Sequence, residues 1–507
     1  MHRDTDVLVV GAGPTGLLLA AELALAGVRT LVLERRCERQ ANSRALNLHP
    51  RSLEILDQRG LADRFLALGR TVPGWQFAAP LTTPLDFSVL NSAHPHALLL
   101  SQARTEALLE QRAVELGAQI RRGHTVTDLW QDAAGVSAGV TGPDGHTTVR
   151  AEFAVGCDGA RSLVRRAAGI AFPGTEETFT AMVGDFADAD HSDLQRPRRH
   201  GVLVSRLEHG LTRFVVMDPA RMRTPSAEPV TLEEFRTALL RACGTDCGVA
   251  RPRWLSRFGN ATRLAERYRS GRLLLAGDAA HIHFPVGAQG LNTGLQDAMN
   301  LGWKLAAEVQ GWAAPGLLDT YHSERHRVGE EVTARTEAQA LLVELPQVEQ
   351  YRRPARRLCE LLDTLLGLDQ VNQYLAGLLS ALDTAYPPQD PTAHALTGRR
   401  IPDIPLTLSA DGRRTSVHSL LHDGTMLLLS LADVPDASPC LPSSAVRPRL
   451  VRAVTARAHG DEDALLGLTE VLVRPDGHVA WATETKDPRE LHAERTHALN
   501  SWIHAAK

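Results

Sequence analysis

The sequence has little cysteine and lysine, no long uninterrupted apolar run and no large excess of charge of either sign. Its six cysteines are scattered over 507 residues, which is too sparse for a disulfide framework. Cys243 and Cys247 lack the spacing of a thioredoxin-type dithiol, and no second Cys or His pair lies near them to complete a zinc site. We therefore expect reduced thiols, no metal site and a cytoplasmic protein.

Charge and apolar length exclude two further classes. The net charge of −4 gives no reason to expect a nucleic acid or an anionic membrane as a partner. The most apolar stretch, residues 7–28, follows Asp4 and Asp6 and is interrupted by glycines, a proline and Glu22, unlike a signal peptide or a membrane span. With 43% hydrophobic residues and this length, the chain is expected to form two or three globular domains.

The first motif that is present is the glycine pattern GAGPTG at residues 11–16. An apolar strand at 6–10 precedes it, a helix follows, and a second strand at 30–33 ends in Glu34. In such a unit Gly11 permits the tight turn, Gly13 admits a pyrophosphate and Gly16 lets the helix pack on the strand. The acid suits the hydroxyls of a ribose. The stretch predicts a dinucleotide site without deciding between NAD and FAD.

Two later strand ends favour a flavin. Asp158 follows a strand in AEFAVGCDGARSLVRRAAGI (151–170), and Asp278 follows another in GRLLLAGDAAHIHFPVGAQGLN (271–292). The second loop leads to a helix start, whose N–H groups and partial positive charge would stabilise a reduced flavin. Each motif alone also fits an ordinary strand-turn-helix. Residues 291, 295, 298, 302, 305 and 306 share one face, so this helix is expected to be amphipathic.

With these three motifs the sequence resembles the class A flavoprotein monooxygenases, of which p-hydroxybenzoate hydroxylase is the type. The resemblance covers nearly the whole chain and is greatest to hydroxylases that tailor aromatic polyketides. SRALNLHPRSLEILDQRGL (43–61), ALLLSQARTEALLEQRAVELGA (97–118) and VLVRPDGHVAW (471–481) support that placement. It implies non-covalent FAD, with NADPH as co-substrate and no second dinucleotide fold, and indeed no second GxGxxG follows a strand after residue 20.

The resemblance also implies which residues contact FAD. Glu34 would bind the adenosine ribose, Arg44 and Gln102 the pyrophosphate and ribityl groups, and Val126 would lie near the adenine. Asp278 would bind the ribityl chain, the 285–292 segment would surround the isoalloxazine, and the segment around Asp158 would serve both FAD and the nicotinamide cofactor. The full set is Gly11, Gly13, Pro14, Thr15, Gly16, Glu34, Arg35, Arg44, Gln102, Val126, Asp158, Asp278, Pro285, Gly287, Gly290, Leu291 and Asn292.

The implied fold is α/β: a Rossmann-like FAD domain interleaved with an α+β substrate domain, followed by a thioredoxin-like domain. The FAD domain would comprise residues 1–175 and 266–390, with 65–100 adding strands to the substrate sheet of 176–265. A hairpin is expected at 200–219 and helices at 315–385. Residues 395–507 would form the last domain, with Cys440 as its only cysteine and hence no dithiol activity. Trp75, Phe77, Phe87, Phe214 and Met217 are candidates for a substrate pocket and equally for core positions.

The implied reaction is NADPH-dependent hydroxylation of a polycyclic aromatic polyketide by molecular oxygen, through a flavin C4a-hydroperoxide. The cofactor supplies this chemistry, so the sequence names no catalytic residue, and His281 and His283 are assigned no role. Inactivation of rifamycin- or tetracycline-type antibiotics, Baeyer–Villiger oxygenation and a non-catalytic flavin-binding role remain as alternatives. The sequence leaves open the substrate, the carbon oxidised, NADPH against NADH, and whether the chain is a homodimer.

Overall fold

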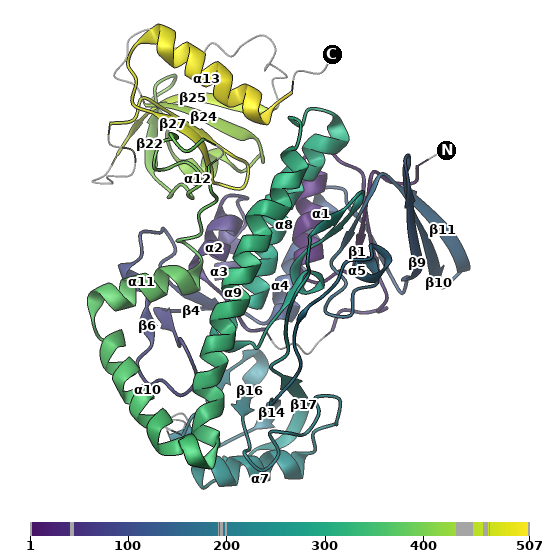
Figure 1. Ribbon diagram of the computed structural model, residues 1–507, viewed down its shortest axis with the longest axis vertical. Coiled ribbons are helices and arrows are strands. Elements are labelled where there is room, and N and C mark those ends of the chain that lie inside the picture. Colours follow the sequence, from purple (N-terminus) through teal and green to yellow (C-terminus); the bar gives the residue numbers. More distant parts are fainter. Residues whose placement is uncertain are drawn as a thin grey trace.

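A computed structural model describes residues 3–40, 45–190, 192, 196–197, 200–388, 390–431, 450–459, 465 and 467–504. Arg44 and Cys440 lie outside these residues. A C-terminal sheet occupies one end of the molecule, a small antiparallel sheet occupies the other, and the N-terminal sheet lies between them (Figure 1). Within the described part, no helix has both the length and the apolarity needed to cross a membrane.

The central sheet contains the expected N-terminal strands. It has six strands in the order β19-β20-β12-β1-β2-β8, all parallel except β19. Every residue of its two N-terminal strands is buried, as expected for a parallel sheet covered on both faces. The strands are β1 (Val7–Val10), β2 (Thr30–Glu34), β8 (Gln119–Arg122), β12 (Phe153–Gly156), β19 (Arg269–Ser270) and β20 (Leu273–Leu275).

Helices cover one face of this sheet and a second sheet covers the other. The helices α1 (Pro14–Leu25) and α8 (Gly290–Gln310) pack against each other, and α4 (Gln102–Glu115) packs beside α1. An antiparallel sheet of β9 (Thr125–Asp132), β10 (Gly135–Gly142) and β11 (Gly145–Ala151) lies on the side away from α8 (Figure 1). Both layers contribute to one apolar core.

The helix α8 differs from its predicted amphipathic form. Every residue from Asn292 to Ala307 is buried, including Asp297, Asn300 and Lys304. The periodicity correctly placed the apolar residues, but the polar face is covered as well. The following helix α9 (Thr320–Glu344) and the C-terminal part of the chain pack over it.

The small antiparallel sheet has the strand order β15-β16-β14-β17. The expected hairpin is confirmed, since β15 and β16 pair across the turn at Glu208–Gly210. Side chains alternate between its faces: Ala181, Val183, Val215 and Phe258 join one apolar cluster, whereas Met182, Phe186 and Phe214 pack against α7 (Leu232–Cys243). Phe214 therefore takes the core position that was one of its two expected roles, whereas Met217 packs against the other cluster. The strands are β14 (Thr180–Asp188), β15 (Leu203–Arg206), β16 (Thr212–Val216) and β17 (Ala250–Gly259).

Residues 65–100 add no strand to that sheet, so this expectation is wrong. Their strands pair with one another and with β3 (Asn47–Leu48), in the orders β3-β7-β4 and β5-β6. They do contact the face formed by Val183 and Phe258, because Trp75, Phe77 and Phe87 belong to the same cluster. The strands are β4 (Arg70–Val72), β5 (Gly74–Trp75), β6 (Leu85–Asp86) and β7 (Ala97–Leu99).

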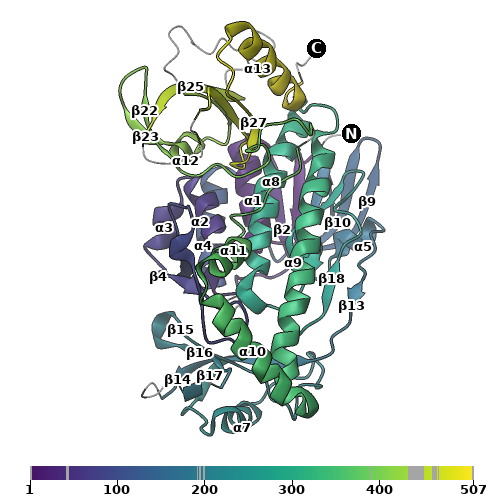
Figure 2. The same cartoon turned by 60° about the vertical axis from the view of Figure 1, so that its left-hand side comes forward.

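The predicted helical region at 315–385 is confirmed. After α9, the chain forms α10 (Arg352–Leu366) and α11 (Asp369–Ser380), which run along the side of the molecule beside the β4–β6 region (Figures 1 and 2). The remaining short elements of this part are α2 (Pro50–Asp57), α3 (Ala62–Leu66), α5 (Leu163–Ala167), β13 (Gly174–Thr175), β18 (Thr262–Leu264) and β21 (His281–Ile282).

The C-terminal part forms a separate six-stranded sheet in the order β23-β22-β25-β24-β26-β27. Only β24 and β25 are parallel, and α13 packs beside β27. Its elements are β22 (Pro405–Leu408), β23 (Arg414–Ser416), α12 (Val417–Leu420), β24 (Met426–Leu431), β25 (Val451–Ala458), β26 (Glu470–Val473), β27 (Val479–Thr483) and α13 (Pro488–Trp502).

Candidate functional site

The three sequence motifs meet at the carboxyl ends of β1, β12 and β20. Gly11 has a positive φ of 104°, and a Cβ there would lie 2.4 Å from the carbonyl oxygen of Cys157. A Cβ on Gly277 would lie 2.7 Å from Thr15 Oγ1. The first motif therefore touches the second through Gly11 and the third through Thr15. These backbones approach so closely that side chains at the glycines would separate them.

Gly13 differs from the other glycines of its turn. A Cβ on Gly16 would lie 2.1 Å from the Gly11 carbonyl oxygen, whereas one on Gly13 would meet no heavy atom within 4 Å. Gly13 caps α1 without a side-chain hydrogen bond, and Pro14 opens the helix. The first-turn N–H groups of α1 are thus free of a side-chain cap, beside open space. This arrangement suits a pyrophosphate.

Glu34 is buried at the end of β2 and is fixed in direction by the backbone. Its Oε2 accepts a hydrogen bond from the Ala12 N–H at 2.9 Å, and its Oε1 accepts one from the Arg36 N–H at 3.0 Å. A carboxylate has about four lone-pair positions, so two remain for a diol. The side chain is therefore held in place while it retains the capacity to accept from ribose hydroxyls.

Two acids extend the site along the strand ends. Asp158 Oδ2 accepts hydrogen bonds from the N–H groups of Leu163 at 2.6 Å and Val164 at 3.3 Å, the first two residues of α5. Its Oδ1 is buried without a hydrogen-bond partner. Buried acceptors are rarely left unpaired, so this oxygen points to a missing donor. Asp278, at the end of β20, is exposed.

The segment 285–292 forms a strained turn that leads into α8. Gly287 has a φ of 67° and Ala288 a φ of 56°, a conformation that L residues rarely adopt. Pro285 is exposed, and Gly290 and Leu291 are half-buried. The N–H groups of Gly290, Leu291 and Asn292 have no acceptor within α8, because they belong to its first turn. The expected donor edge is thus present at the start of this helix.

The side chain of Asn292 is committed to the protein itself. Its Oδ1 accepts hydrogen bonds from the His49 N–H at 2.8 Å and from Ser52 Oγ at 2.7 Å. Its Nδ2 donates to the carbonyl oxygens of Asn47 and Ala288 at 3.3 and 2.9 Å. Only its backbone can face a ligand, while its side chain fastens residues 47–52 to the start of α8.

A buried ionic cluster holds the third motif in place. The sequence patterns did not predict it. Asp297 accepts hydrogen bonds from the Gly277 N–H at 3.0 Å, from His281 Nε2 at 2.8 Å and from Arg325 Nε at 2.7 Å. Burial alone would raise the pKa of Asp297, but Arg325 and His281 hold it below its usual range. In the sequence Asp297 lies off the apolar face of the helix, and no local pattern marks it as buried. His281 is thereby placed in a supporting role beneath Gly277.

The segment 43–61 also contains His49, whose structural role the sequence did not predict. Its side chain is buried, and Nε2 lies 2.8 Å from the Gly287 carbonyl oxygen. Burial lowers the pKa of His49 to about 4, so the ring is neutral near pH 7. Its partner is 238 positions away in the chain, so no local pattern could have indicated the contact.

The other expected residues occupy different positions around the site. Gln102 begins α4, and its Nε2 donates to Glu106 Oε1 at 2.7 Å. Val126 belongs to the apolar core, with 8% of its surface exposed. Arg35 is exposed just beyond β2. The prediction for Arg44 falls on a residue outside the described part of the chain.

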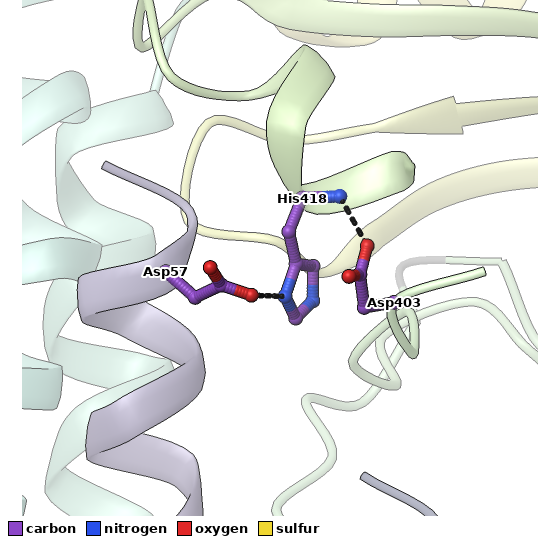
Figure 3. Close-up of side chains that lie close together, drawn as sticks. All are labelled: Asp57, Asp403 and His418. Carbon is purple, nitrogen blue, oxygen red and sulfur yellow. Dashed lines mark hydrogen bonds and ion pairs between the residues drawn. The ribbon is translucent and has the colours of Figure 1, made fainter. Parts of the chain in front are cut away.

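A separate group of polar side chains, Asp57, Asp403 and His418, joins α2 to the C-terminal part (Figure 3). Asp57 Oδ2 lies 3.1 Å from His418 Nδ1, and Asp403 Oδ1 accepts from the His418 N–H at 2.8 Å. Such a trio has the composition of a cation site. Both carboxylates are, however, already engaged by the histidine, so we interpret the group as a hydrogen-bonded link between the two parts.

The chain matches known families and proteins over nearly its whole length. A family described as "FAD binding domain" matches residues 4–336, and one described as "Aromatic-ring hydroxylase, C-terminal" matches residues 394–506. A 12-dehydrotetracycline 5-monooxygenase/anhydrotetracycline 6-monooxygenase of Streptomyces rimosus is 45% identical over 98% of both chains. A rifampicin monooxygenase of Streptomyces venezuelae is 44% identical over 99% of both.

A solved structure extends the likeness to the fold. The OxyS anhydrotetracycline hydroxylase of Streptomyces rimosus superposes with a TM-score of 0.86 at 43% identity, covering 99% of this chain and all of the other. Both family matches, the full-length relatives and this superposition agree with the flavin motifs. The chain therefore belongs to the FAD-dependent aromatic-ring hydroxylases, the class A flavoprotein monooxygenases.

Proposed function

We propose that this monooxygenase uses NADPH and oxygen to hydroxylate a polycyclic aromatic polyketide. The observation that carries the proposal is the convergence of all three flavin motifs at one set of strand ends, next to an aromatic-lined sheet face. Relatives named for tetracycline-type and rifampicin substrates support the class of substrate.

FAD fits the residues that are present. The open space at Gly13 would take the pyrophosphate, the held carboxylate of Glu34 the ribose, and Asp278 the ribityl chain. The buried, unpaired Oδ1 of Asp158 would gain a donor. These assignments rest on the geometry of each residue and on the family motif together.

The protein's own part in the reaction is to bind, orient and exclude water. Bound FAD would supply electron transfer and activation of oxygen. The first-turn N–H groups of α8 would favour negative charge at the nearby ring edge, through the helix dipole. Trp75, Phe87, Val183 and Phe258 would form an apolar environment for a planar substrate.

We further propose the division into an FAD unit (1–175 and 266–390), a substrate unit (176–265) and a C-terminal unit (395–507). Each unit has an apolar cluster of its own, which supports the division, and two further clusters join the units to one another. The order β22-β25-β24-β26-β27, with a parallel β24–β25 pair and a following hairpin and helix, favours a thioredoxin-like C-terminal unit. A Cys440→Ser variant should keep full turnover, and a large loss would contradict a purely structural role for this unit.

The test is NADPH consumption under air with anhydrotetracycline, an angucyclinone and rifampicin as separate probes. A probe-dependent increase in rate and a product heavier by one oxygen atom would support hydroxylation, and the responding probe would indicate the substrate class. A lactone product that is heavier by the same one oxygen atom would instead indicate Baeyer–Villiger oxygenation. Formation of hydrogen peroxide alone with every probe would overturn the proposal.

A further inference from the structure

His49 occupies the point where the 285–292 segment and the aromatic substrate face come together. It caps the N-terminus of α2 in an extended conformation, directly after β3. Its backbone N–H donates to Asn292, and its imidazole lies against Gly287. Both ends of the 287–292 turn are therefore held by a single residue from another part of the chain.

The imidazole also lies against two aromatic rings. The ring of Trp75 lies edge-on at a centroid distance of 6.5 Å, and that of Phe87 at 5.8 Å. Both belong to the apolar cluster that includes Val183 and Phe258 of the substrate sheet. Contacts of this kind within a close-packed cluster transmit displacement, because the interior has little free volume to absorb it.

The hydrogen bond to Gly287 has a defined polarity. A carbonyl oxygen only accepts, so Nε2 must carry the proton and donate it. The neutral ring then presents an unprotonated Nδ1, which is buried and has no partner. The imidazole therefore joins the aromatic cluster to the Gly287 carbonyl group through one hydrogen bond, in which His49 is the donor.

Gly287 is also packed closely against another element. A Cβ on Gly287 would lie 2.7 Å from Leu379 Cδ1 of α11, so the turn has little free space around it. The turn is thus in contact with α11 as well as hydrogen-bonded to the imidazole. A shift of the imidazole must therefore change the position or mobility of the turn.

We propose that His49 is a positioning residue that couples the seating of a planar substrate against the half-buried Trp75 to the segment that holds the flavin ring. The inference rests on the proposed function for the identity of the ligand. The link between His49 and Gly287, however, can be tested without any ligand or turnover.

The ligand-free test measures hydrogen exchange of the 285–292 segment in the FAD-loaded protein. His49→Phe keeps an aromatic ring and removes the donor, whereas His49→Gln keeps an N–H donor. We expect exchange to become about fivefold faster in His49→Phe, the factor that one net hydrogen bond contributes, and to be largely restored in His49→Gln. An unchanged rate in His49→Phe would overturn the inference.

His478 provides a matched control. It is also buried, and burial lowers its pKa to about 4 as well, but it lies between β26 and β27, and in the described part of the chain its ring contacts Tyr386 and Asp476 and not the 285–292 segment. His478→Phe should leave exchange of the 285–292 segment unchanged. Equal acceleration in both variants would show a general loss of stability and would contradict a specific coupling.

The coupled test adds anhydrotetracycline as the probe and follows both segment exchange and the absorption spectrum of bound FAD. Wild type should show slower exchange and a shifted spectrum, and His49→Phe should bind the probe with a much smaller response of both. A full response in His49→Phe would overturn the coupling. If wild type binds none of the probes, the substrate class of the proposed function fails, while the ligand-free result still decides the link to Gly287.

Discussion

At the scale of single residues, Glu34 gives the sharpest test of the flavin assignment. Glu34→Ala removes a charged acceptor for ribose hydroxyls, and hydrogen bonds to charged groups contribute about 1.5–3 kcal/mol. We expect FAD affinity to fall about tenfold or more, measured by fluorescence titration of the apoprotein. Glu34→Gln keeps the shape of the side chain, so its affinity for FAD should lie between those of wild type and Glu34→Ala. An unchanged dissociation constant for Glu34→Ala would contradict the assignment.

Gly13 and Gly16 form a matched pair, because the same substitution should affect different properties. Gly16→Ala places a methyl group against the Gly11 carbonyl oxygen, 2.1 Å away, and should destabilise the apoprotein by about 2 kcal/mol or more. Gly13→Ala meets no protein atom, so the apoprotein should keep its stability while FAD binding weakens.

Chemical denaturation of both apoproteins and FAD titration would separate the two effects. Equal FAD affinity in Gly13→Ala and wild type would mean that the open space beside α1 does not hold the cofactor. Equal stability of Gly16→Ala and wild type would contradict the close approach of α1 to its preceding turn.

The residues that could be predicted from the sequence are those whose role is set locally. Gly11, Gly16 and Glu34 lie within one strand-turn-helix-strand unit, so their spacing fixes their positions. Asp297 and His49 could not be predicted in the same way. Their partners, Arg325 and Gly287, are 28 and 238 positions away and come close only after the sheets have packed.

At the scale of elements, α8 shows why a correctly identified helical period led to an incorrect prediction of which faces are buried. The apolar positions were placed correctly, but Asn300 and Lys304 on the other face are also buried. They donate to Glu324 Oε2 of α9 at 2.6 and 2.7 Å, and Arg474 of the C-terminal part donates to both oxygens of Glu324. Their burial depends on a partner segment far along the chain, which helical periodicity does not reveal.

This buried network makes Arg474 a critical residue for the union of α9 and the C-terminal sheet. Arg474→Met keeps much of the side-chain volume but leaves Glu324 and Asp476 without their shared cation. Breaking one partner of a buried ion pair costs about 3–5 kcal/mol. We expect a loss of that order in the free energy of unfolding, measured by denaturant titration.

The matched control is Arg413→Met, in an exposed pair with Asp411 at 3.8 Å. It should change stability by less than about 1 kcal/mol. Equal effects of the two substitutions would show that the buried network contributes no more than a surface pair.

At the scale of the whole molecule, the orders of all the sheets lay beyond the sequence patterns. Residues 65–100 were expected to join the substrate sheet, yet β7 pairs with β3 and β4 instead. Alternating apolar residues specify that a segment is a strand and which face is buried, but not which neighbour it pairs with. Family resemblance supplied the domain order, and the spatial partners of these strands required the fold itself.

Three histidines in different parts of the molecule, two of them buried and His283 half-buried, predict a common response to acid. Burial lowers the pKa values of His49, His283 and His478 from 6.5 to about 4. The unfolded chain therefore binds these protons more readily than the folded chain. The stability that this difference confers is complete above about pH 6.5 and is lost as the pH falls towards 4, by up to about 3 kcal/mol for each ring.

Paired carboxylates do not produce this loss. Burial would raise the pKa of Glu324, but Arg474 and Lys304 lower it to about 2, so this group begins to weaken folding only below its unfolded value of 4.5. The midpoint of thermal unfolding of the apoprotein should decline most steeply as the pH falls from about 6.5 to 4. His478→Gln should reduce the slope between pH 6.5 and 4, since it removes one of the groups that take up a proton on unfolding. A midpoint that stays constant down to pH 4.5 would contradict the neutral, buried state of these rings.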